Sequence, residues 1–420
     1  IYFAVSARLS YSPPPFSKGY QSVENIDFLY GVLDLDFWGY VLVSFVMLQI
    51  TILSVTFYLH RDAAHRALDL HPAIRQFCRA WLWVSTGIIT REWVAIHRKH
   101  HARCETPDDP HSPQIEGLRK VLLEGAELYQ EEAKNPETLK KYGRGTPDDW
   151  LENSLYLKRR NIGITLFVVT CLVLFGVPGI IMIAVQMVSQ PLLAAGIING
   201  VGHHTGYRNF ECDDASRNVV PWGLLLGGEE LHNNHHAFPS SARFSIRPWE
   251  VDIGWGAVRV LRVLGLAKVR RVAPRPALDP ARSSIDLETA RAIIVNRMHV
   301  MRDYTRSVTL PVMKRELSAL REKGRSLPRR ARRLVTRQPA LLDAAARARL
   351  SELLESSQRM RTVHEFRERL KALWDSKGSV SNERLISQIR EWCQQAEASG
   401  IRVLQDFADR LRAYSLQSTV

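Results

Sequence analysis

Histidine is the residue type whose spacing in this sequence points most directly to chemistry. The chain has 14 histidines, and eight of them form three short clusters. The clusters read His60-Arg-Asp-Ala-Ala-His65, His97-Arg-Lys-His100-His101 and His232-Asn-Asn-His235-His236. Neutral imidazole is the commonest metal ligand among protein side chains. Because eight imidazoles are more than one ion can bind, the sequence predicts at least two metal ions.

Spacing within the clusters indicates how they could face a metal. Residues three and four apart lie on one face of a helix, so His97, His100 and His101 are predicted to converge on one point. The same holds for the third cluster. His60 and His65 are five residues apart, which requires a helix end or a local distortion.

A fourth histidine element is Asn199-Gly-Val-Gly-His203-His204. We expect His203 to join the clusters and His204 to point away from them. The isolated histidines are interpreted as ordinary solvated or core residues, since histidine is intermediate in burial. These are His71, His111, His299 and His364.

Three apolar stretches must position the clusters. Phe37–Leu59 contains no charge over 23 residues, and as a helix it would be ~34 Å long, enough to cross a hydrocarbon core of ~30 Å. Phe77–Ile96 contains charged residues that are costly at mid-bilayer, so it is a poor span. Ile162–Ile198 has no charge but is interrupted at Gly176-Val-Pro178-Gly179, which predicts a helical hairpin.

The hairpin agrees with the placement of the clusters. All of them must lie on one side of a membrane to meet, so an even number of crossings must separate any two. Two crossings within Ile162–Ile198 return the chain to the same side at Asn199. The basic run Lys158-Arg159-Arg160 before the hairpin indicates that this side is cytoplasmic.

Ligand types narrow the choice of metal. The five cysteines are scattered, without a Cys-x-x-Cys pair, so we expect neither a disulfide framework nor thiolate ligands beside the histidines. Imidazoles suit zinc, copper, iron or nickel. A membrane-embedded metal pair could attack an unactivated C–H bond by reducing O₂. Zinc has no redox chemistry, so that reaction favours iron.

Composition divides the chain into blocks. Its 420 residues carry a net charge of +14, and basic, helix-forming sequence dominates after Pro248. We expect a poorly ordered leader at 1–30, a membrane domain at 31–272, a linker at 273–295 and a basic helical module at 296–420. The basic tail would face anionic lipid, and we do not expect it to bind nucleic acid because no such motif is present.

The order and spacing of the histidine clusters, together with the element Asn199-x3-His203 after the last hairpin, closely resemble those of the membrane fatty acid desaturases of the stearoyl-CoA type. The stretches Glu92-Trp93-Val-Ala-Ile-His97 and Gly227-Gly-Glu-Glu-Leu-His232 resemble the bacterial branch. The resemblance implies an all-α integral membrane protein whose transmembrane helices are capped by a cytosolic helical domain with a dimetal site. It also implies that Asn199 holds a metal-bound water. The implied metal ligands are His60, His65, His97, His100, His101, His203, His232, His235 and His236.

The same resemblance implies an O₂-dependent enzyme with two irons that forms a cis double bond near the delta-9 position of an acyl-CoA or acyl-lipid. Zinc in purified protein would then be an artefact of overexpression. Electrons must come from a separate donor such as a ferredoxin or rubredoxin. The expected location is the bacterial inner membrane, with the histidines on the cytoplasmic side.

Two departures and two alternatives remain. The family has four spans where three are evident here, and the tail resembles the C-terminal helices of insertion-sequence transposases. A hydroxylase or ketolase could use the same scaffold on another lipid. A metal transporter would need ionisable residues within its spans, and Phe37–Leu59 and Ile162–Ile198 lack them.

Overall fold

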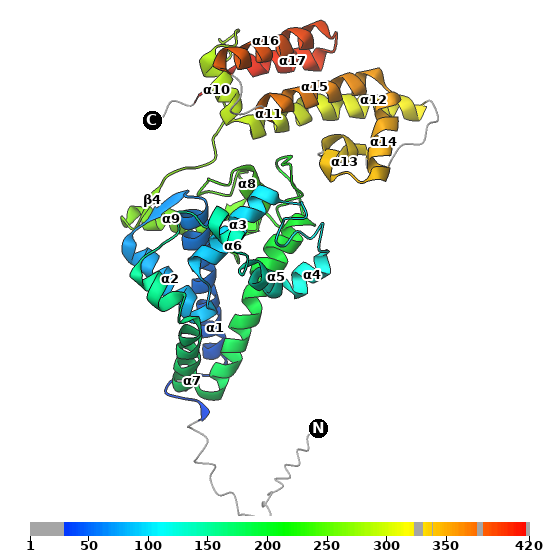
Figure 1. Cartoon of the computed structure of the whole chain (residues 1–420). Coiled ribbons are helices and arrows are strands. Elements are labelled where there is room, and N and C mark those ends of the chain that lie inside the picture. Colours follow the sequence, from blue (N-terminus) through cyan, green and yellow to red (C-terminus); the bar gives the residue numbers. More distant parts are fainter. Residues whose placement is uncertain (1–28, 323–330, 338, 376–380, 417–420) are drawn as a thin grey trace, which may run out of the picture.

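The computed structural model describes residues 29–322, 331–337, 339–375 and 381–416. Most of the described chain is helical, as expected. A head of short helices and loops sits at one end of long apolar helices, and a separate group of C-terminal helices lies beyond the head (Figure 1). The leader expected at 1–30 falls almost wholly outside the described residues.

Within the described part of the chain, two helical stretches are long and apolar enough to cross a membrane, Phe37–Ala64 and Arg160–His203. The first is helix α1 (Phe37–Ser54), which continues directly as the π-helix η2 (Val55–Ala64). Asp36 begins it by accepting a 2.7 Å hydrogen bond from the Gly39 backbone N–H, which satisfies one of the free donors at a helix start.

The second stretch reverses direction part-way. It consists of α7 (Arg160–Gln190), the π-helix η4 (Pro191–Gly200) and the 3-10 turn η5 (Val201–His203). Gly176 has φ 59° and ψ −139°, a conformation open to glycine, and the two arms of α7 lie side by side below the head (Figure 1). The predicted helical hairpin is therefore present, and the chain turns where the sequence is interrupted.

The segment predicted to be a poor span forms two helices rather than one. Helix α2 (Pro72–Thr86) ends at Gly87, whose φ is 67°, and α3 (Thr90–Arg103) follows after a short turn. Arg79 is buried on α2, where it forms ion pairs with Asp149 at 2.6 Å and Glu152 at 2.9 Å. This arginine therefore lies in a polar contact of the head, where its charge is compensated.

The rest of the head consists of short helices and two strand pairs. Strand β1 (Leu68–Leu70) pairs antiparallel with β4 (Ala267–Val269), and β2 (Trp222–Gly223) pairs parallel with β3 (Val251–Asp252). The helices are α4 (Leu118–Leu123), α5 (Gly125–Glu132), α6 (Pro136–Tyr142), η3 (Leu151–Tyr156), α8 (His232–Ala237) and α9 (Ile253–Val263). The buried core of the head joins the end of the first apolar helix, at Phe57–Leu59, to α2 and to Val258 of α9.

The C-terminal helices have a hydrophobic core of their own, which includes Ile285, Trp392 and Phe407. Helix α10 packs into this core from within the expected linker segment 273–295. Strand β5 (Ala277–Leu278) pairs antiparallel with β6 (Tyr414–Ser415). The helices are α10 (Leu287–Val295), α11 (Arg297–Tyr304), η6 (Thr305–Thr309), α12 (Leu310–Glu322), α13 (Ala331–Thr336), η7 (Pro339–Leu341), α14 (Ala344–Glu355), α15 (Gln358–Asp375), α16 (Asn382–Ala398) and α17 (Arg402–Arg412).

The C-terminal helices contact the head around Phe210–Asp213 and at Phe238. The ring of His299 lies 5.2 Å from the rings of both Phe210 and Phe238. Lys371 forms an ion pair with Asp213 at 2.8 Å.

Candidate metal centre

All nine histidines predicted as ligands come together in the head, in two groups. Within each group, one potential ligand atom per residue lies within 4.8 Å of the others. Group 1 consists of His60, His65, His97, His101 and His235. Group 2 consists of His100, His203, His232 and His236, all of which are buried.

The five-residue spacing of His60 and His65 is explained by helix η2. A π-helix has i→i+5 hydrogen bonds, and the His65 backbone N–H donates to the His60 carbonyl at 3.0 Å. The two rings consequently lie side by side in an edge-to-face arrangement, with centroids 5.0 Å apart. The local distortion that the spacing required is thus a wide turn at the end of the first apolar helix.

The second and third clusters are each divided between the groups, so the prediction that each cluster converges on one point is wrong. On α3, His97 and His101 belong to group 1 and His100 to group 2. The reason is helix geometry, because residues four apart differ by only about 40° around the axis, whereas His100 is turned by about 100° from His101. On α8 the division is similar, with His235 in group 1 and the other two histidines in group 2.

Within the groups the imidazoles point their Nε2 atoms at one another. In group 1, His65 Nε2 lies 2.7 Å from His97 Nε2, and His235 Nε2 lies 2.9 Å from His101 Nε2 and 3.0 Å from His60 Nε2. In group 2, His203 Nε2 lies 3.2 Å from His100 Nε2 and 2.9 Å from His232 Nε2.

Four carboxylates lie against the outer nitrogens of these rings. Glu229 contacts His60 Nδ1 at 2.7 Å, and Asp214 contacts His236 Nδ1 at 2.8 Å. In group 2, Asp109 contacts His100 Nδ1 and Glu105 contacts His203 Nδ1, both at 2.9 Å. A carboxylate accepts the Nδ1 proton, which leaves Nε2 as a bare lone pair directed into the group.

These carboxylates were not identified from the sequence. A signal was present for three of them, since Glu105, Asp109 and Glu229 each lie within four residues of a histidine in the chain, whereas Asp214 does not. Glu229 even falls within the stretch Gly227-Gly-Glu-Glu-Leu-His232 that precedes the third cluster. Acidic residues near metal-binding histidines are the usual partners that fix imidazole orientation.

The electrostatics keep most of the imidazoles neutral. Burial, together with neighbouring histidines, lowers the pKa of His97, His101 and His232 well below the ordinary value. Burial opposes protonation of His100 too, but the Asp109 carboxylate outweighs it and raises that pKa. Burial likewise acts against ionisation of Asp214, yet the His236 imidazole holds its pKa below the usual range.

This arrangement fits a pair of metal ions. His100 and His203 both have a carboxylate against Nδ1, so in their neutral forms the Nε2 lone pairs of the two rings face each other at 3.2 Å. The Nε2 of His236 is buried with no hydrogen-bond partner. Lone pairs converge in this way on a cation, and imidazole donors suit iron, zinc, copper or nickel.

A cysteine lies at the edge of group 2, which corrects the expectation that no thiol is near. Cys104 Sγ lies 3.8 Å from His100 Nε2 and 3.7 Å from His203 Nδ1. Burial and nearby acids raise the pKa of this thiol well above its ordinary value. It is therefore protonated at neutral pH and a poor ligand in that form.

The remaining polar residues named from the sequence take different places. Asn199 lies on η4, with Nδ2 3.3 Å from His111 Nε2. His111 is buried, and its ring lies 4.5 Å from that of His100. His204 is exposed and contacts the Thr205 hydroxyl, so it points away as expected. His71 caps the start of α2.

Comparison with known proteins agrees with this geometry. Residues 36–252 match the family model described as fatty acid desaturase. The chain belongs to the fatty acid desaturase family. It is thus a fatty acyl desaturase of the delta-9 type by family, an oxidoreductase of lipid metabolism.

Curated relatives cover the same part of the desaturase. It is 33% identical over 265 residues to Delta-9 desaturase-like 5 protein of Arabidopsis thaliana, an alignment that covers 59% of this chain and 82% of the relative. It is 31% identical over 252 residues to sn-1 stearoyl-lipid 9-desaturase of Synechocystis, covering 57% of this chain and 74% of the relative. It is 29% identical over 232 residues to Acyl-CoA 5-desaturase AL21 of Anemone leveillei, covering 51% and 66%.

The C-terminal part of the desaturase matches a different family. Residues 284–417 match the family model described as transposase. This finding agrees with the transposase resemblance noted for the tail. The matched segment coincides with the C-terminal helices, whose core begins at Ile285.

Proposed function

We propose that this desaturase inserts a cis double bond near the delta-9 position of a fatty acyl chain carried by CoA or by a membrane lipid. Relatives named as delta-9, acyl-lipid and acyl-CoA desaturases support the proposal. The observation that carries it is the pair of imidazole groups, each of which has its ligand atoms within 4.8 Å of one another. We propose all nine histidines as ligands, with Asn199 holding a metal-bound water.

The reaction sets the requirement for cofactors. Removing one hydrogen from each of two neighbouring methylenes supplies two electrons, and reducing O₂ to two waters takes four. Two further electrons, with two protons, must therefore come from an external donor such as a ferredoxin or rubredoxin. Two iron ions, when bound in the histidine groups, supply the redox chemistry with O₂, whereas zinc would not.

The side chains of the chain itself prepare the site. Glu229 and Asp214 hold protons on the outer nitrogens of His60 and His236, so that the inner nitrogens stay free to bind. Trp93 stacks on His97 with ring centroids 4.8 Å apart and an interplanar angle of 15°, which fixes that ring. Burial excludes bulk water from group 2, whereas His65 and His101 leave group 1 partly open.

Membrane placement follows from the same elements. Group 1 begins in η2, which extends the first apolar helix, and His203 of group 2 ends the second apolar stretch. We propose that the apolar helices lie in the inner membrane of a bacterium with the head on the cytoplasmic side. An acyl chain in the bilayer would then reach the histidines from the membrane side.

The test is fatty-acid analysis of a host with a simple lipid profile that expresses the full chain. A new monounsaturated acyl chain is expected, with the bond position mapped by mass spectrometry. His235→Ala should abolish it, whereas His204→Ala is the matched control, because His204 is exposed and outside both groups. A hydroxylated or oxidised lipid in place of the alkene would contradict the proposal.

A further inference from the structure

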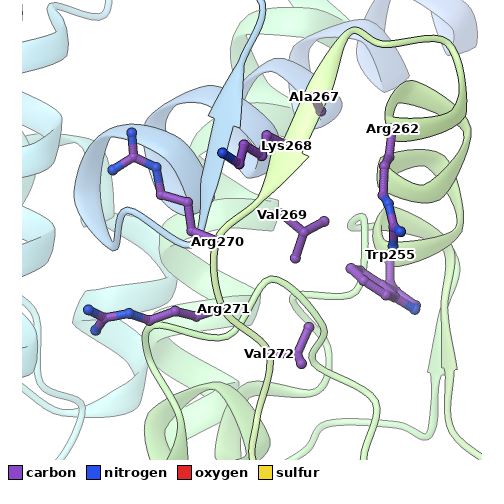
Figure 2. A pocket seen from close by; sticks show the side chains of 8 residues that line it. All are labelled: Trp255, Arg262, Ala267, Lys268, Val269, Arg270, Arg271 and Val272. Carbon is purple, nitrogen blue, oxygen red and sulfur yellow. The ribbon is translucent and has the colours of Figure 1, made fainter. Parts of the chain in front are cut away.

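A basic cleft lies on the side of the head, between α9 and strand β4. Its volume is about 600 Å³. Figure 2 shows Trp255 and Arg262 entering from the helix, with Val269 and Val272 from the strand and the segment after it. Lys268, Arg270 and Arg271 leave the same segment on its other side (Figure 2). The cleft therefore has an apolar centre, with Arg262 on one wall and three further cations on the outer side of the other wall.

The cations of this cleft are largely uncompensated. Arg262, Lys268 and Arg271 are exposed, and among the described residues none of them has an acidic partner. Arg270 alone is paired, with Asp69 at 3.1 Å. Unpaired surface cations attract a partner of opposite charge and accelerate its approach.

Apolar side chains that line the cleft or follow Arg262 in the chain are exposed to solvent. Val263 is 86% exposed, Leu264 62% and Val272 50%. An apolar patch edged by charge is typical of protein interaction surfaces, which have an apolar centre and a polar rim. The C-terminal helices do not cover it through the contacts described above, which lie at Phe210, Asp213 and Phe238.

The cleft wall is bonded directly to the segment that carries group 1. The backbone N–H groups of Arg270 and Arg271 donate to the Ala67 carbonyl at 2.9 and 3.3 Å. Ala67 is two residues beyond His65. A short chain of hydrogen bonds and covalent bonds thus joins this surface to a metal-facing imidazole.

A second route joins the same wall to His60. The Ala242 N–H donates to the Arg271 carbonyl at 2.9 Å, and Arg61 Nε donates to the Ala242 carbonyl at 3.0 Å. Arg61 follows His60 in the chain. Both histidines of the first cluster are therefore connected to the wall of the cleft through covalent bonds and hydrogen bonds.

We propose that this cleft is the docking site for a small acidic electron-carrier protein that delivers electrons to group 1. The inference rests on the proposed function, which requires two electrons from outside for each double bond. An acidic carrier matches the unpaired cations in charge, and its apolar contact area would cover the valines and leucine at the edge. The reduced carrier loses one electron at a time, and no atom is transferred.

Direct binding tests the docking site without requiring turnover. The probe is an acidic [2Fe–2S] ferredoxin, with an acidic rubredoxin as the second probe, added to the metal-loaded full chain in mild detergent. Binding should weaken steeply with salt, since screening shortens from about 10 Å at 0.1 M to about 3 Å at 1 M. Arg262→Glu with Lys268→Glu should slow association about tenfold to a hundredfold at low salt.

The matched control is Lys140→Glu, an exposed lysine on α6 away from the cleft. It should leave ferredoxin binding unchanged. Failure of the unaltered protein to bind either probe in a salt-dependent manner would overturn the proposal. So would equal binding by the unaltered protein and the double variant.

Turnover then separates this inference from the proposed function. With reduced ferredoxin, the double variant should show a raised KM for ferredoxin, and with dithionite and a viologen mediator it should match the unaltered protein. Absence of alkene under every reductant would refute the proposed function while leaving the binding result standing. If the double variant binds ferredoxin as the unaltered protein does but no longer binds phosphatidylglycerol vesicles, the cleft is a lipid-binding site and the docking proposal is overturned.

Discussion

Replacing one of the carboxylates that contact the histidines should lower the affinity of one histidine group for its metal ion and leave the affinity of the other group unchanged. Asp214 accepts from the Ser216 backbone N–H at 2.9 Å through Oδ1 and contacts His236 Nδ1 at 2.8 Å through Oδ2. In Asp214→Asn the first contact can persist, but the new amide N–H₂ faces the ring. His236 Nδ1 must then accept a hydrogen bond, so the proton moves to Nε2, the atom directed into group 2.

The size of the effect follows from the single contact that changes. Loss of a carboxylate that orients a histidine ligand typically costs 10–100-fold in metal affinity, or about 1.4–2.7 kcal/mol. Glu229→Gln applies the same perturbation to His60 in group 1, where the carboxylate lies 2.7 Å from Nδ1. Glu229 also lies 3.5 Å from Arg61, so this variant carries an added folding cost.

The assay is metal content after dialysis against a graded series of chelator concentrations. The unaltered protein should retain two equivalents over most of the series. Asp214→Asn should lose one metal equivalent at a chelator concentration about 10–100-fold lower than the unaltered protein does. It should keep the second equivalent. Asp213→Asn is the control, because this neighbouring acid pairs with Lys371 and not with a histidine. A curve for Asp214→Asn that superimposes on the control, or loss of both metals together, would refute the reasoning.

Three further outcomes are expected. His100→Ala combined with His235→Ala removes one member of each group, so elemental analysis should find less than two metal equivalents; full metal retention would exclude the two-group site. Asn199→Ala should lower activity per bound metal about 10–100-fold, as losses next to metal ligands do, while circular dichroism and metal content stay unchanged; unaltered activity per metal would exclude the water-holding role. A chain ending at Arg282 lacks the C-terminal helices and should still bind two metals and form alkene with added donor, measured by the same lipid analysis; a folded, metal-loaded but inactive product would show that these helices take part in substrate or donor binding.

The positions of the histidines could be predicted because their signal is local. Clusters with spacings of three, four and five residues are visible in the chain, and the break at Gly176 could be read from its glycine and proline neighbours. The division of the clusters between two groups could not be predicted in the same way. It depends on how far α3 is rotated against η2 and α8, which distant packing contacts determine.

The supporting carboxylates show the same limit. Glu229 reaches His60 across 169 positions of sequence separation, and Glu105 reaches His203 across 98. Charge in the sequence does not tell a buried acid bonded to a ring from a solvated one. The thiol of Cys104 is four residues from His100 and was visible beside the second cluster in the chain, but only the fold brings it to His203.

The wide turn of η2 has a consequence for how this part of the protein can change in evolution. The turn places His60 and His65 together only because it contains one residue more than an ordinary helical turn. Deleting one residue between His60 and His65 would restore regular winding, which keeps the two imidazoles on one face four residues apart but changes the rotation of the preceding apolar helix relative to the head. Every position before the deletion would also shift against the hairpin. Insertions and deletions among homologues should therefore be excluded from this segment, even though it begins within an apolar helix where length is otherwise easily adjusted.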